Sequence, residues 1–234
     1  MHAVLLAGYK KSGKTQLATS LCEQFREWNI PVAVAKYSHH SLDRPDSDTA
    51  RLTSVADHVL AFDPDTASLI QPGKRSLQDF LPLISARVLI IEGGKHLENL
   101  PRIILPREGD NAAELDNGLG IGQWTSSPDP GMDSLADTAQ AAQLILNRGF
   151  LLPDLDCAGC GRDTCAELAR DIVAGRAELS ECTSLSSPSI QVTVNGAPIP
   201  LNPFVQDLLR NTLTGIVSAL KGGQSGRIEI SLDI

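Results

Sequence analysis

The residues in this sequence that are best suited to chemistry form a phosphate-binding loop near the N-terminus. Residues 8–15 read Gly-Tyr-Lys-Lys-Ser-Gly-Lys-Thr and satisfy the pattern G-x-x-x-x-G-K-[ST]. Two glycines let the backbone curl so that amide groups face phosphate oxygens, Lys14 reaches the β- and γ-phosphates, and the Thr15 hydroxyl ligates Mg²⁺. We therefore predict a nucleoside triphosphate site with contacts from the following residues: Gly8, Lys11, Ser12, Gly13, Lys14, Thr15 and Gln16.

A carboxylate is predicted to complete this site. The apolar run 88–91 ends in Glu92, as expected of a buried strand that delivers an acid to the metal. There Glu92 can hold the water shell of Mg²⁺ or orient an attacking water. We predict Lys14 and Glu92 as catalytic residues and Thr15 and Glu92 as magnesium residues. The alternative is that Glu92 is a surface acid at the end of a strand.

A polar segment after the second predicted strand offers a further contact to the metal. Residues 36–40 read Lys-Tyr-Ser-His-His and are followed by Asp43, Asp48 and Arg51. Phosphate-loop proteins often place a loop that senses Mg²⁺ and the γ-phosphate here, so we predict Asp48 as a magnesium ligand, with Asp43 as the other candidate. Zinc is not expected at the two histidines, because adjacent side chains point apart. The alternative is a solvated polar loop.

Four of the five cysteines form a second group with metal-binding chemistry. They follow the spacing Cys157-x2-Cys160-x4-Cys165-x16-Cys182. Four soft thiolates suit an iron–sulfur cluster or zinc. Structural zinc sites usually carry two separate Cys-x2-Cys pairs and this segment has one, so [4Fe–4S] is favoured, while zinc, structural thiols and disulfides remain alternatives. The fifth, Cys22, is expected to be a small core residue.

The elements that must position these residues follow an α/β pattern. Short apolar runs alternate with helical patterns over residues 1–148, which predicts a P-loop NTPase-like, mostly parallel sheet with helices on both faces. The expected strands cover residues 3–7, 31–36, 58–62, 87–92 and 102–106. The expected helices cover residues 14–28, 74–84 and 133–147, the last capped by Asp133 or Ser134. Residues 109–131, rich in Gly, Pro, Ser and Asp, are predicted to form a loop.

Two smaller regions follow this predicted nucleotide-binding domain. Residues 149–186 are predicted as the four-cysteine iron–sulfur domain, with a helix over residues 166–173. Residues 187–234 are predicted as a C-terminal strand–helix–strand segment, whose helix begins near Pro203. Its strands cover residues 190–194, before a turn at Asn195-Gly196, and residues 228–232, after a helix end at Gly222-Gly223.

Composition restricts the class of protein. The net charge of −8 with no basic stripe argues against a nucleic-acid partner. No apolar run approaches the ~20 residues that span a bilayer, so no membrane association is expected. The first predicted strand starts at once and leaves no room for a signal peptide, so we expect a cytoplasmic protein with reduced thiols.

Three of these segments together resemble the MobB family of molybdopterin-guanine dinucleotide biosynthesis adaptors. They are residues 8–15, the segment 36–51 with its Lys-x-x-His-His and Asp-x-x-Arg patterns, and Ile-Glu-Gly at 91–93. The resemblance covers residues 1–148 and implies a P-loop protein that binds GTP and Mg²⁺, hydrolyses GTP weakly and is usually a dimer. It implies that Gly13, Lys14 and Thr15 hold the phosphates and the metal.

The resemblance also implies that Asp48 and Glu92 support the metal. Two stretches depart from the family pattern: residues 45–48 read Pro-Asp-Ser-Asp in place of Pro-Gly-Lys-Asp, and residues 92–95 read Glu-Gly-Gly-Lys in place of Glu-Gly-Phe/Tyr-Lys. The segment 151–182 is similar to the four-cysteine [4Fe–4S] domain of redox and corrinoid proteins. Residues 192–221 look like a tail seen on cluster-bearing members of the adaptor family.

The expected function is therefore that of an adaptor in molybdenum or tungsten cofactor synthesis. It would assist a molybdopterin guanylyltransferase-type partner and serve molybdoenzymes, as a homodimer, with slow GTP hydrolysis because no arginine finger is evident. The base itself is not readable from the residues. The alternative is an iron–sulfur ATPase, electron-transfer protein or metallocluster maturation factor whose hydrolysis is coupled to the cluster. A small-metabolite kinase is a third possibility, for which we find no set of acceptor-binding residues.

Overall fold

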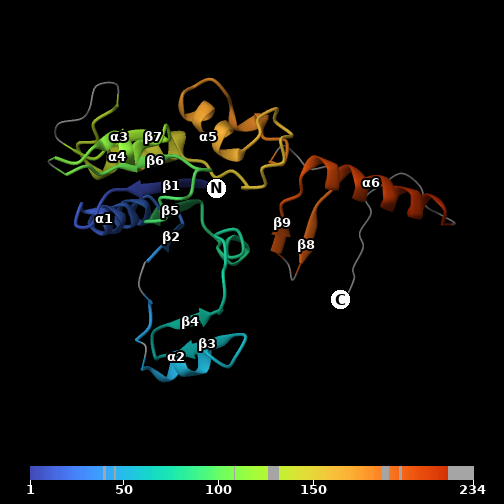
Figure 1. Ribbon diagram of the computed structural model, residues 1–234, viewed down its shortest axis with the longest axis horizontal. Helices are drawn as coiled ribbons and strands as arrows, with labels where there is room; N and C mark the ends of the chain where they lie inside the picture. Colours follow the sequence, from blue (N-terminus) through green and yellow to red (C-terminus); the bar gives the residue numbers. More distant parts are fainter. Residues whose placement is uncertain are drawn as a thin grey trace.

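A five-stranded parallel sheet forms the centre of the protein (Figure 1). The computed structural model describes residues 1–38, 41–44, 46–107, 109–125, 132–185, 190–194 and 197–220. The strand order is β2-β5-β1-β6-β7, and all four neighbouring pairs are parallel. The strands are β1 (His2–Ala7), β2 (Val32–Lys36), β5 (Val88–Glu92), β6 (Arg102–Ile104) and β7 (Gly120–Gln123). The predicted mostly parallel α/β sheet is confirmed.

Two long helices cover one face of this sheet. They are α1 (Lys14–Glu27) and α4 (Thr138–Arg148), which pack against each other and against β1. In α1 the four-residue spacing of Leu17, Leu21 and Phe25 puts all three on the side facing the sheet, where they are buried on strand residues such as Val4 and Ile90. This packing fixes the start of α1, and with it the phosphate loop, at the end of β1.

The opposite face is covered by a short helix and by irregular segments. Helix α3 (Ala112–Asp116) contributes Ala112 and Leu115, and the segment after β5 contributes Leu97 and Leu100. These side chains bury Ala3, Leu5, Ala7, Leu89 and Ile91 of the two central strands. The strands are therefore apolar on both sides, as their continuous apolar runs indicate.

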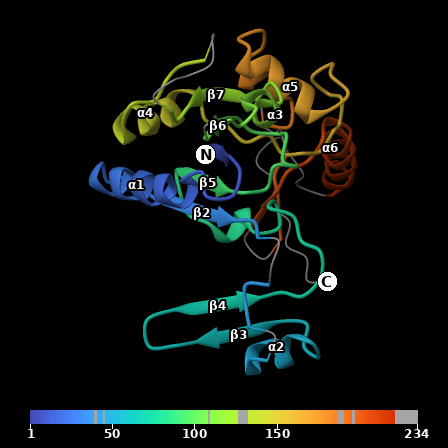
Figure 2. The same ribbon diagram turned by 60° about the vertical axis from the view of Figure 1, so that its left-hand side comes forward.

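The chain between β2 and β5 leaves the sheet as an arm. It holds α2 (Asp48–Thr53) and an antiparallel hairpin of β3 (Val59–Phe62) and β4 (Ala67–Ile70), and both views show it extending away from the sheet and from α1 (Figures 1 and 2). The strand predicted at residues 58–62 thus exists, but its assignment to the main sheet was wrong. It pairs with β4 because Asp63 closes a tight turn by accepting the amide hydrogens of Asp65 and Thr66.

Two predicted helices differ from the structure. The helix predicted over residues 74–84 is wrong: only a 3₁₀ turn, η1 (Leu81–Leu83), forms there, because Asp79 bonds the Ser76 amide in a local turn and Pro82 has no amide hydrogen to donate. The helix predicted from residue 133 begins at Thr138. Its cap is Asp137, which accepts from the Gln140 amide at 2.8 Å, rather than Asp133 or Ser134.

The loop predicted at residues 109–131 contains regular structure. Both α3 and β7 lie within it. Strand β7 extends the sheet beside β6, and its last residue, Gln123, exchanges backbone hydrogen bonds with Asp133 and Leu135. This pairing also explains why residues 133–135 do not start a helix.

The cysteine segment packs directly on the sheet domain. Its helix α5 (Cys165–Val173) buries Leu168 and Ala169 together with Leu152, Phe150 and, from just before β7, Leu119. A short 3₁₀ turn, η2 (Leu179–Glu181), leads to Cys182.

Polar contacts hold the same two regions together. Arg170 of α5 pairs with Glu98 at 2.8 Å, and the backbones of Asn99 and Leu152 bond each other at 2.9 Å, while the Asn99 side chain donates to the Leu152 carbonyl at 2.7 Å. The two regions therefore share one hydrophobic cluster and one polar seam.

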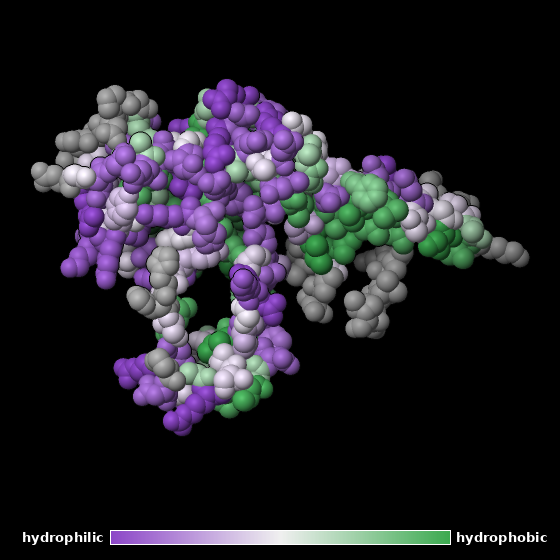
Figure 3. Space-filling model, in the orientation of Figure 1, coloured by the Kyte–Doolittle hydropathy of each residue, from purple (hydrophilic) through white to green (hydrophobic). Residues whose placement is uncertain are grey.

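The C-terminal region forms a hairpin followed by a helix. Strands β8 (Val192–Val194) and β9 (Ala197–Ile199) pair antiparallel and precede α6 (Pro203–Ser218), so β9 was missed by the predicted strand–helix–strand order. The predicted turn at 195–196, helix end at 222–223 and strand at 228–232 lie outside the described residues. Helix α6 exposes the apolar side chains of Phe204, Leu208 and Ile216, and the right side of Figure 3 shows a green, hydrophobic area there.

Candidate functional site

The phosphate loop adopts the tight turn between β1 and α1 that the sequence predicts. Gly8 lies against the strand-end backbone of β6, since a Cβ there would sit 2.8 Å from the Leu105 carbonyl oxygen. Gly13 precedes α1 with φ 87°, a left-handed conformation that favours glycine. The loop thus ends at the N-terminus of α1, where the helix dipole favours an anion.

Lys14 is held over the loop. Its ammonium donates to the Tyr9 carbonyl at 2.6 Å and lies 3.4 Å from Ser12 Oγ. Partial burial lowers the pKa of Lys14 below the ordinary lysine value; Glu92 opposes this shift, and the charges of Lys95 and other nearby cations add to it. The ammonium is therefore partly desolvated and feels the repulsion of nearby cations, which phosphate oxygens would relieve.

Glu92 connects the phosphate loop to the neighbouring strand. Strand β5 lies between β1 and β2, so that Glu92 is in register with Leu6 on one side and Lys36 on the other. One carboxylate oxygen accepts the Thr15 hydroxyl at 2.8 Å, and the other lies 3.3 Å from the Lys36 ammonium. Because the Thr15 hydroxyl hydrogen is taken by Glu92, its lone pairs are left for a cation in the cleft.

An open cleft of about 470 Å³ lies over these groups. Its lining residues are Lys10, Lys11, Ser12, Gly13, Lys14, Thr15, Gln16 and Glu92. All of the predicted nucleotide-binding residues except Gly8 therefore line this cleft. Gly8 supports the loop from below and does not line the cleft.

The structure does not bring the predicted magnesium ligand Asp48 to this cleft. Asp48 begins α2 in the arm, its side chain is 95% exposed, and it pairs with Arg51 at 3.6 Å. Asp43, the other candidate, accepts the Ser47 hydroxyl at 2.7 Å; hydrogen bonds from Thr49 and Ser47 lower the pKa of its carboxyl. Asp43 and Asp48 therefore stabilise the turn and the first residues of α2, which gives these polar residues a local structural role. His39, His40 and Pro45 lie outside the described residues.

Sequence reasoning did not single out Lys36 or Tyr37 as site residues. Lys36 ends β2 directly beside Glu92, and in the sequence it stands out only as the first residue of the Lys-x-x-His-His pattern. The ring of Tyr37 lies against Gly94 and makes an edge-on contact with His96, with ring centroids 5.3 Å apart. Tyr37 thus fills the space over position 94, where the family pattern has an aromatic residue.

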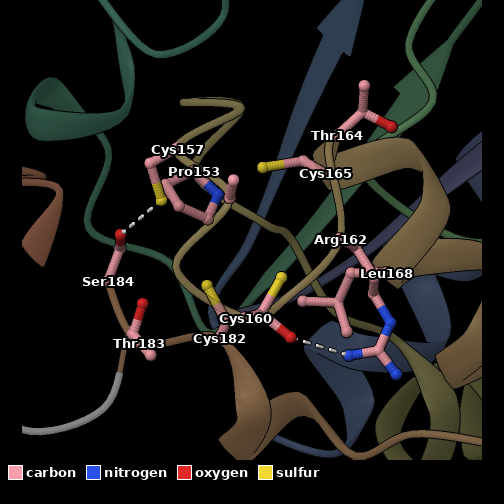
Figure 4. Close-up of a pocket in the computed structure, with 11 residues that line it drawn as sticks. Pro153, Cys157, Cys160, Arg162, Thr164, Cys165, Leu168, Cys182, Thr183 and Ser184 are labelled. Atoms are coloured by element: carbon pink, nitrogen blue, oxygen red, sulfur yellow. Dashed lines mark hydrogen bonds between the residues drawn. The ribbon is translucent and has the colours of Figure 1, made fainter.

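The four clustered cysteines face one cavity. Figure 4 shows the sulfur atoms of Cys157, Cys160, Cys165 and Cys182 pointing into a common space. Cys165 and Cys182 are buried, and burial raises the pKa of both thiols. Ser184 lies 3.5 Å from the sulfur of Cys157.

Charged side chains hold the cysteine loop in place. Arg162 donates to the Cys160 carbonyl at 3.3 Å, to Asp171 of α5 at 2.8 Å and to Glu181 at 2.9 Å, next to Cys182. Hydrogen bonds to the two carboxylates raise the pKa of Arg162 above the ordinary arginine value. One guanidinium therefore joins the loop that carries the first cysteines to the turn that carries the last.

The four thiols around this cavity are soft donors of the kind that bind zinc or an iron–sulfur cluster. A tetrahedral zinc ion with Zn–S bonds of about 2.3 Å needs its sulfurs about 3.8 Å apart. Within the residues that the structure describes, no three His, Cys, Asp or Glu side chains are arranged to hold one metal ion. The four thiols line one small cavity, and soft thiolates are the ligands of iron–sulfur clusters.

Comparison with protein families assigns the first half of the chain. Residues 3–119 match the profile of the family described as "Molybdopterin guanine dinucleotide synthesis protein B", MobB. The chain belongs to the MobB family. Residues 152–184 match a second profile, described as "Putative Fe-S cluster", which includes all four clustered cysteines.

Curated MobB relatives cover this chain to different extents. A Methanocaldococcus jannaschii protein named "Putative molybdopterin-guanine dinucleotide biosynthesis adapter protein" is 24% identical over 100% of this chain and 98% of its own length. The Haemophilus influenzae molybdopterin-guanine dinucleotide biosynthesis adapter protein is 32% identical, over 44% of this chain and 62% of its own length. The similarity to the first protein therefore extends through the cysteine segment.

A solved structure shares the MobB fold. The crystal structure of Bacillus subtilis MobB superposes with a TM-score of 0.52 at 18% identity, covering 64% of this chain and 99% of that one. Helices long and apolar enough to cross a bilayer are absent from the described part of the chain.

Proposed function

We propose that this protein is a GTP-binding adaptor in the synthesis of molybdopterin-guanine dinucleotide, with slow GTP hydrolysis. The observation that carries the proposal is the contact of one carboxylate, Glu92, with both Thr15 and Lys36 beside the phosphate-loop cleft in a chain of the MobB family. The names of the two curated relatives support the adaptor role. A guanylyltransferase that acts on molybdopterin is the proposed partner, molybdoenzymes are proposed recipients, and a cytoplasmic location stays a prediction.

The residues of the cleft have separate tasks in this proposal. Backbone amides of the loop and the ammonium of Lys14 bind the phosphates. Thr15 ligates Mg²⁺ through its oxygen while Glu92 holds the hydroxyl hydrogen, so Glu92 supports the metal through Thr15. The bound Mg²⁺ supplies neutralisation of phosphate charge.

Slow turnover follows from the arginine nearby. Arg107 contributes to the field at Lys14, but its guanidinium is held by both carboxylate oxygens of Asp110 and by the Lys10 carbonyl. An arginine committed to a carboxylate is not free to stabilise developing charge on a phosphate.

Isothermal titration calorimetry tests the nucleotide site. Wild-type protein with Mg²⁺ should bind GTP, and Lys14→Ala should lose binding by more than about tenfold, since the ammonium makes charge-assisted hydrogen bonds to phosphate. Lys74→Ala removes an exposed lysine outside the cleft and serves as the matched control. Absence of heat with GTP and ATP on folded protein would refute the proposal, as would undiminished binding by Lys14→Ala.

We also propose that Cys157, Cys160, Cys165 and Cys182 bind a [4Fe–4S] cluster. Anaerobically purified protein should contain iron and sulfide, and Cys182→Ala should lose both. Cys22 lies on α1, apart from this group, so Cys22→Ala is the matched control. Zinc without sulfide in the wild-type protein would contradict this part of the proposal.

The arm is the proposed homodimer contact. A two-stranded hairpin is marginally stable alone, and β3 exposes Leu60 and Phe62, the latter by 76%. We expect light scattering to show a dimer that Phe62→Ser converts to a monomer, because apolar side chains at a hairpin edge gain most from burial against a second copy. Phe204→Ser, at a phenylalanine that is 73% exposed on α6, is the matched control and should stay dimeric. A monomeric wild-type protein would exclude this contact.

A second candidate function rests on the contact between the two regions. Glu98, six residues after Glu92, pairs with Arg170 of the cysteine segment. This proximity favours an iron–sulfur protein in which nucleotide hydrolysis responds to the cluster. Turnover of ATP and GTP, measured with the cluster oxidised and reduced, decides between them: faster ATP turnover that depends on the cluster state would favour the second function.

A further inference from the structure

Lys36 lies beside Glu92, on the side of that residue away from the phosphate loop. Three neighbouring strands, β2, β5 and β1, end at the same edge of the sheet. Their ends supply Lys36, Glu92 and the phosphate loop in that order. The carboxylate is therefore flanked by a lysine on one side and by the phosphate-binding residues on the other.

One carboxylate holds both of these neighbours. Glu92 accepts the Thr15 hydroxyl at 2.8 Å and lies 3.3 Å from the Lys36 ammonium. The side chain of Glu92 is 13% exposed, whereas that of Lys36 is 53% exposed. The Lys36 side chain is therefore half open to solvent while its ammonium contacts a largely buried carboxylate.

The charge of Lys36 reaches the phosphate-binding lysine. It is among the cations that lower the pKa of Lys14, together with Lys95 and Arg107. Lys14 at the start of α1 and Lys36 at the end of β2 thus repel each other. An anion between them is attracted to both.

Nucleotide binding changes the balance of charge at Glu92. A Mg²⁺ ion on Thr15 brings two positive charges next to the carboxylate and competes with Lys36 for it. A γ-phosphate on that ion supplies a new negative partner for the released ammonium, and a diphosphate does not. Building on the proposed GTP site, we propose that Lys36 is a specificity-determining residue. Its ammonium moves from Glu92 to the γ-phosphate when a triphosphate binds, and this contact favours GTP over GDP.

Lys95 provides a control with the same charge in a different place. Its ammonium lies 4.1 Å from the centre of the Tyr9 ring, and its charge also lowers the pKa of Lys14. Removing Lys95 lowers the positive electrostatic potential at the α- and β-phosphates, which GDP and GTP both carry. Removing Lys36 takes away a contact that only the triphosphate makes.

Calorimetry with GDP and with a slowly hydrolysed GTP analogue, both with Mg²⁺, tests this role. We expect Lys36→Gln to weaken binding of the triphosphate about tenfold, the effect of one charge-assisted hydrogen bond, and binding of GDP less than about twofold. Lys36→Arg should keep the ratio of the two affinities, because it keeps the charge. Lys95→Gln should weaken both nucleotides by the same factor.

The outcomes separate this inference from the proposed function. Wild-type protein that binds neither nucleotide would refute the GTP site itself. Wild-type protein that binds both, with an unchanged affinity ratio in Lys36→Gln, would overturn the role of Lys36 alone. Lys36→Met keeps the aliphatic stem and gives the same comparison on a second variant, and thermal melting establishes that the compared proteins are folded. A changed ratio in Lys95→Gln would equally overturn the assignment.

Discussion

Arg102 gives the sharpest stability prediction, because it is a charged side chain buried to 2% exposure at the start of β6. Its guanidinium donates to three backbone carbonyls: those of Lys95 at 2.8 Å and Leu97 at 2.9 Å, in the segment after β5, and that of Leu115 at 3.1 Å, in α3. One side chain therefore links the segment after β5 and helix α3 to the start of β6. Burial lowers the pKa of Arg102, and Glu98 and Asp116 oppose that shift.

Arg102→Met keeps the length of the side chain and removes its donors. Each buried carbonyl left without a donor costs about 1–3 kcal/mol, so three cost roughly 3–9 kcal/mol. Removing a buried charge returns several kcal/mol of desolvation free energy. We expect a net loss of about 3 kcal/mol in the free energy of unfolding, which lowers Tm by roughly 6–12 °C for a chain of this size.

Urea denaturation followed by circular dichroism measures this loss, with thermal melting as the second readout. Arg107→Met is the matched control, since Arg107 is 46% exposed and pairs with Asp110 near the surface, where an ion pair contributes at most about 1 kcal/mol. If Arg102→Met and Arg107→Met lowered the free energy of unfolding equally, the three carbonyl contacts would not stabilise the fold as inferred.

Three further predictions concern the two sites. Because burial lowers the pKa of Lys14 and its ammonium must be charged to bind phosphate, affinity for GTP should fall as pH rises toward that lowered pKa, with proton uptake on binding; a flat calorimetric profile from neutral to strongly alkaline pH would contradict this. Gly8→Ala places a Cβ 2.8 Å from the Leu105 carbonyl, so it should cost about 1–3 kcal/mol of stability by melting and weaken GTP binding. Arg162→Met removes the link between the cysteine loop and Glu181, so iron and sulfide should be lost on gel filtration faster than from wild-type protein; equal retention would refute the link.

The sequence predicted those parts of the fold whose signal is contiguous. Strand β1, the phosphate loop and α1 follow one another without a break, and Glu92 ends a purely apolar run. Strand β7 gave no such signal because Gly120 and Gly122 are poor strand formers. It is a strand because β6 pairs with it on one side and residues 133–135 continue the pairing at its end, which are contacts between distant segments.

The polar residues that position the sites were hidden for the same reason. Lys36 ends one predicted strand and Arg102 begins another. The role of a charged residue at such a position cannot be recognised until its neighbours in space are known. Arg162 follows two cysteines and acquires its meaning from Glu181, nineteen positions away. Asp48 is the opposite case: the family pattern predicts it at the metal, and the structure places it at the start of α2 in the arm.

The hydrophobic contact of Leu119 and Phe150 with α5 makes the cysteine region part of the folded core rather than an independent module. Deleting everything after residue 148 would bare Leu119 to water and strip Glu98 of its arginine, next to the segment that Arg102 anchors. A ligand that binds the native state also raises the free energy of unfolding of everything that folds with it. With the proposed cluster as that ligand, a shortage of iron would therefore lower the stability and the abundance of the whole polypeptide. An exchange of cysteine regions between relatives would need compensating changes along this contact.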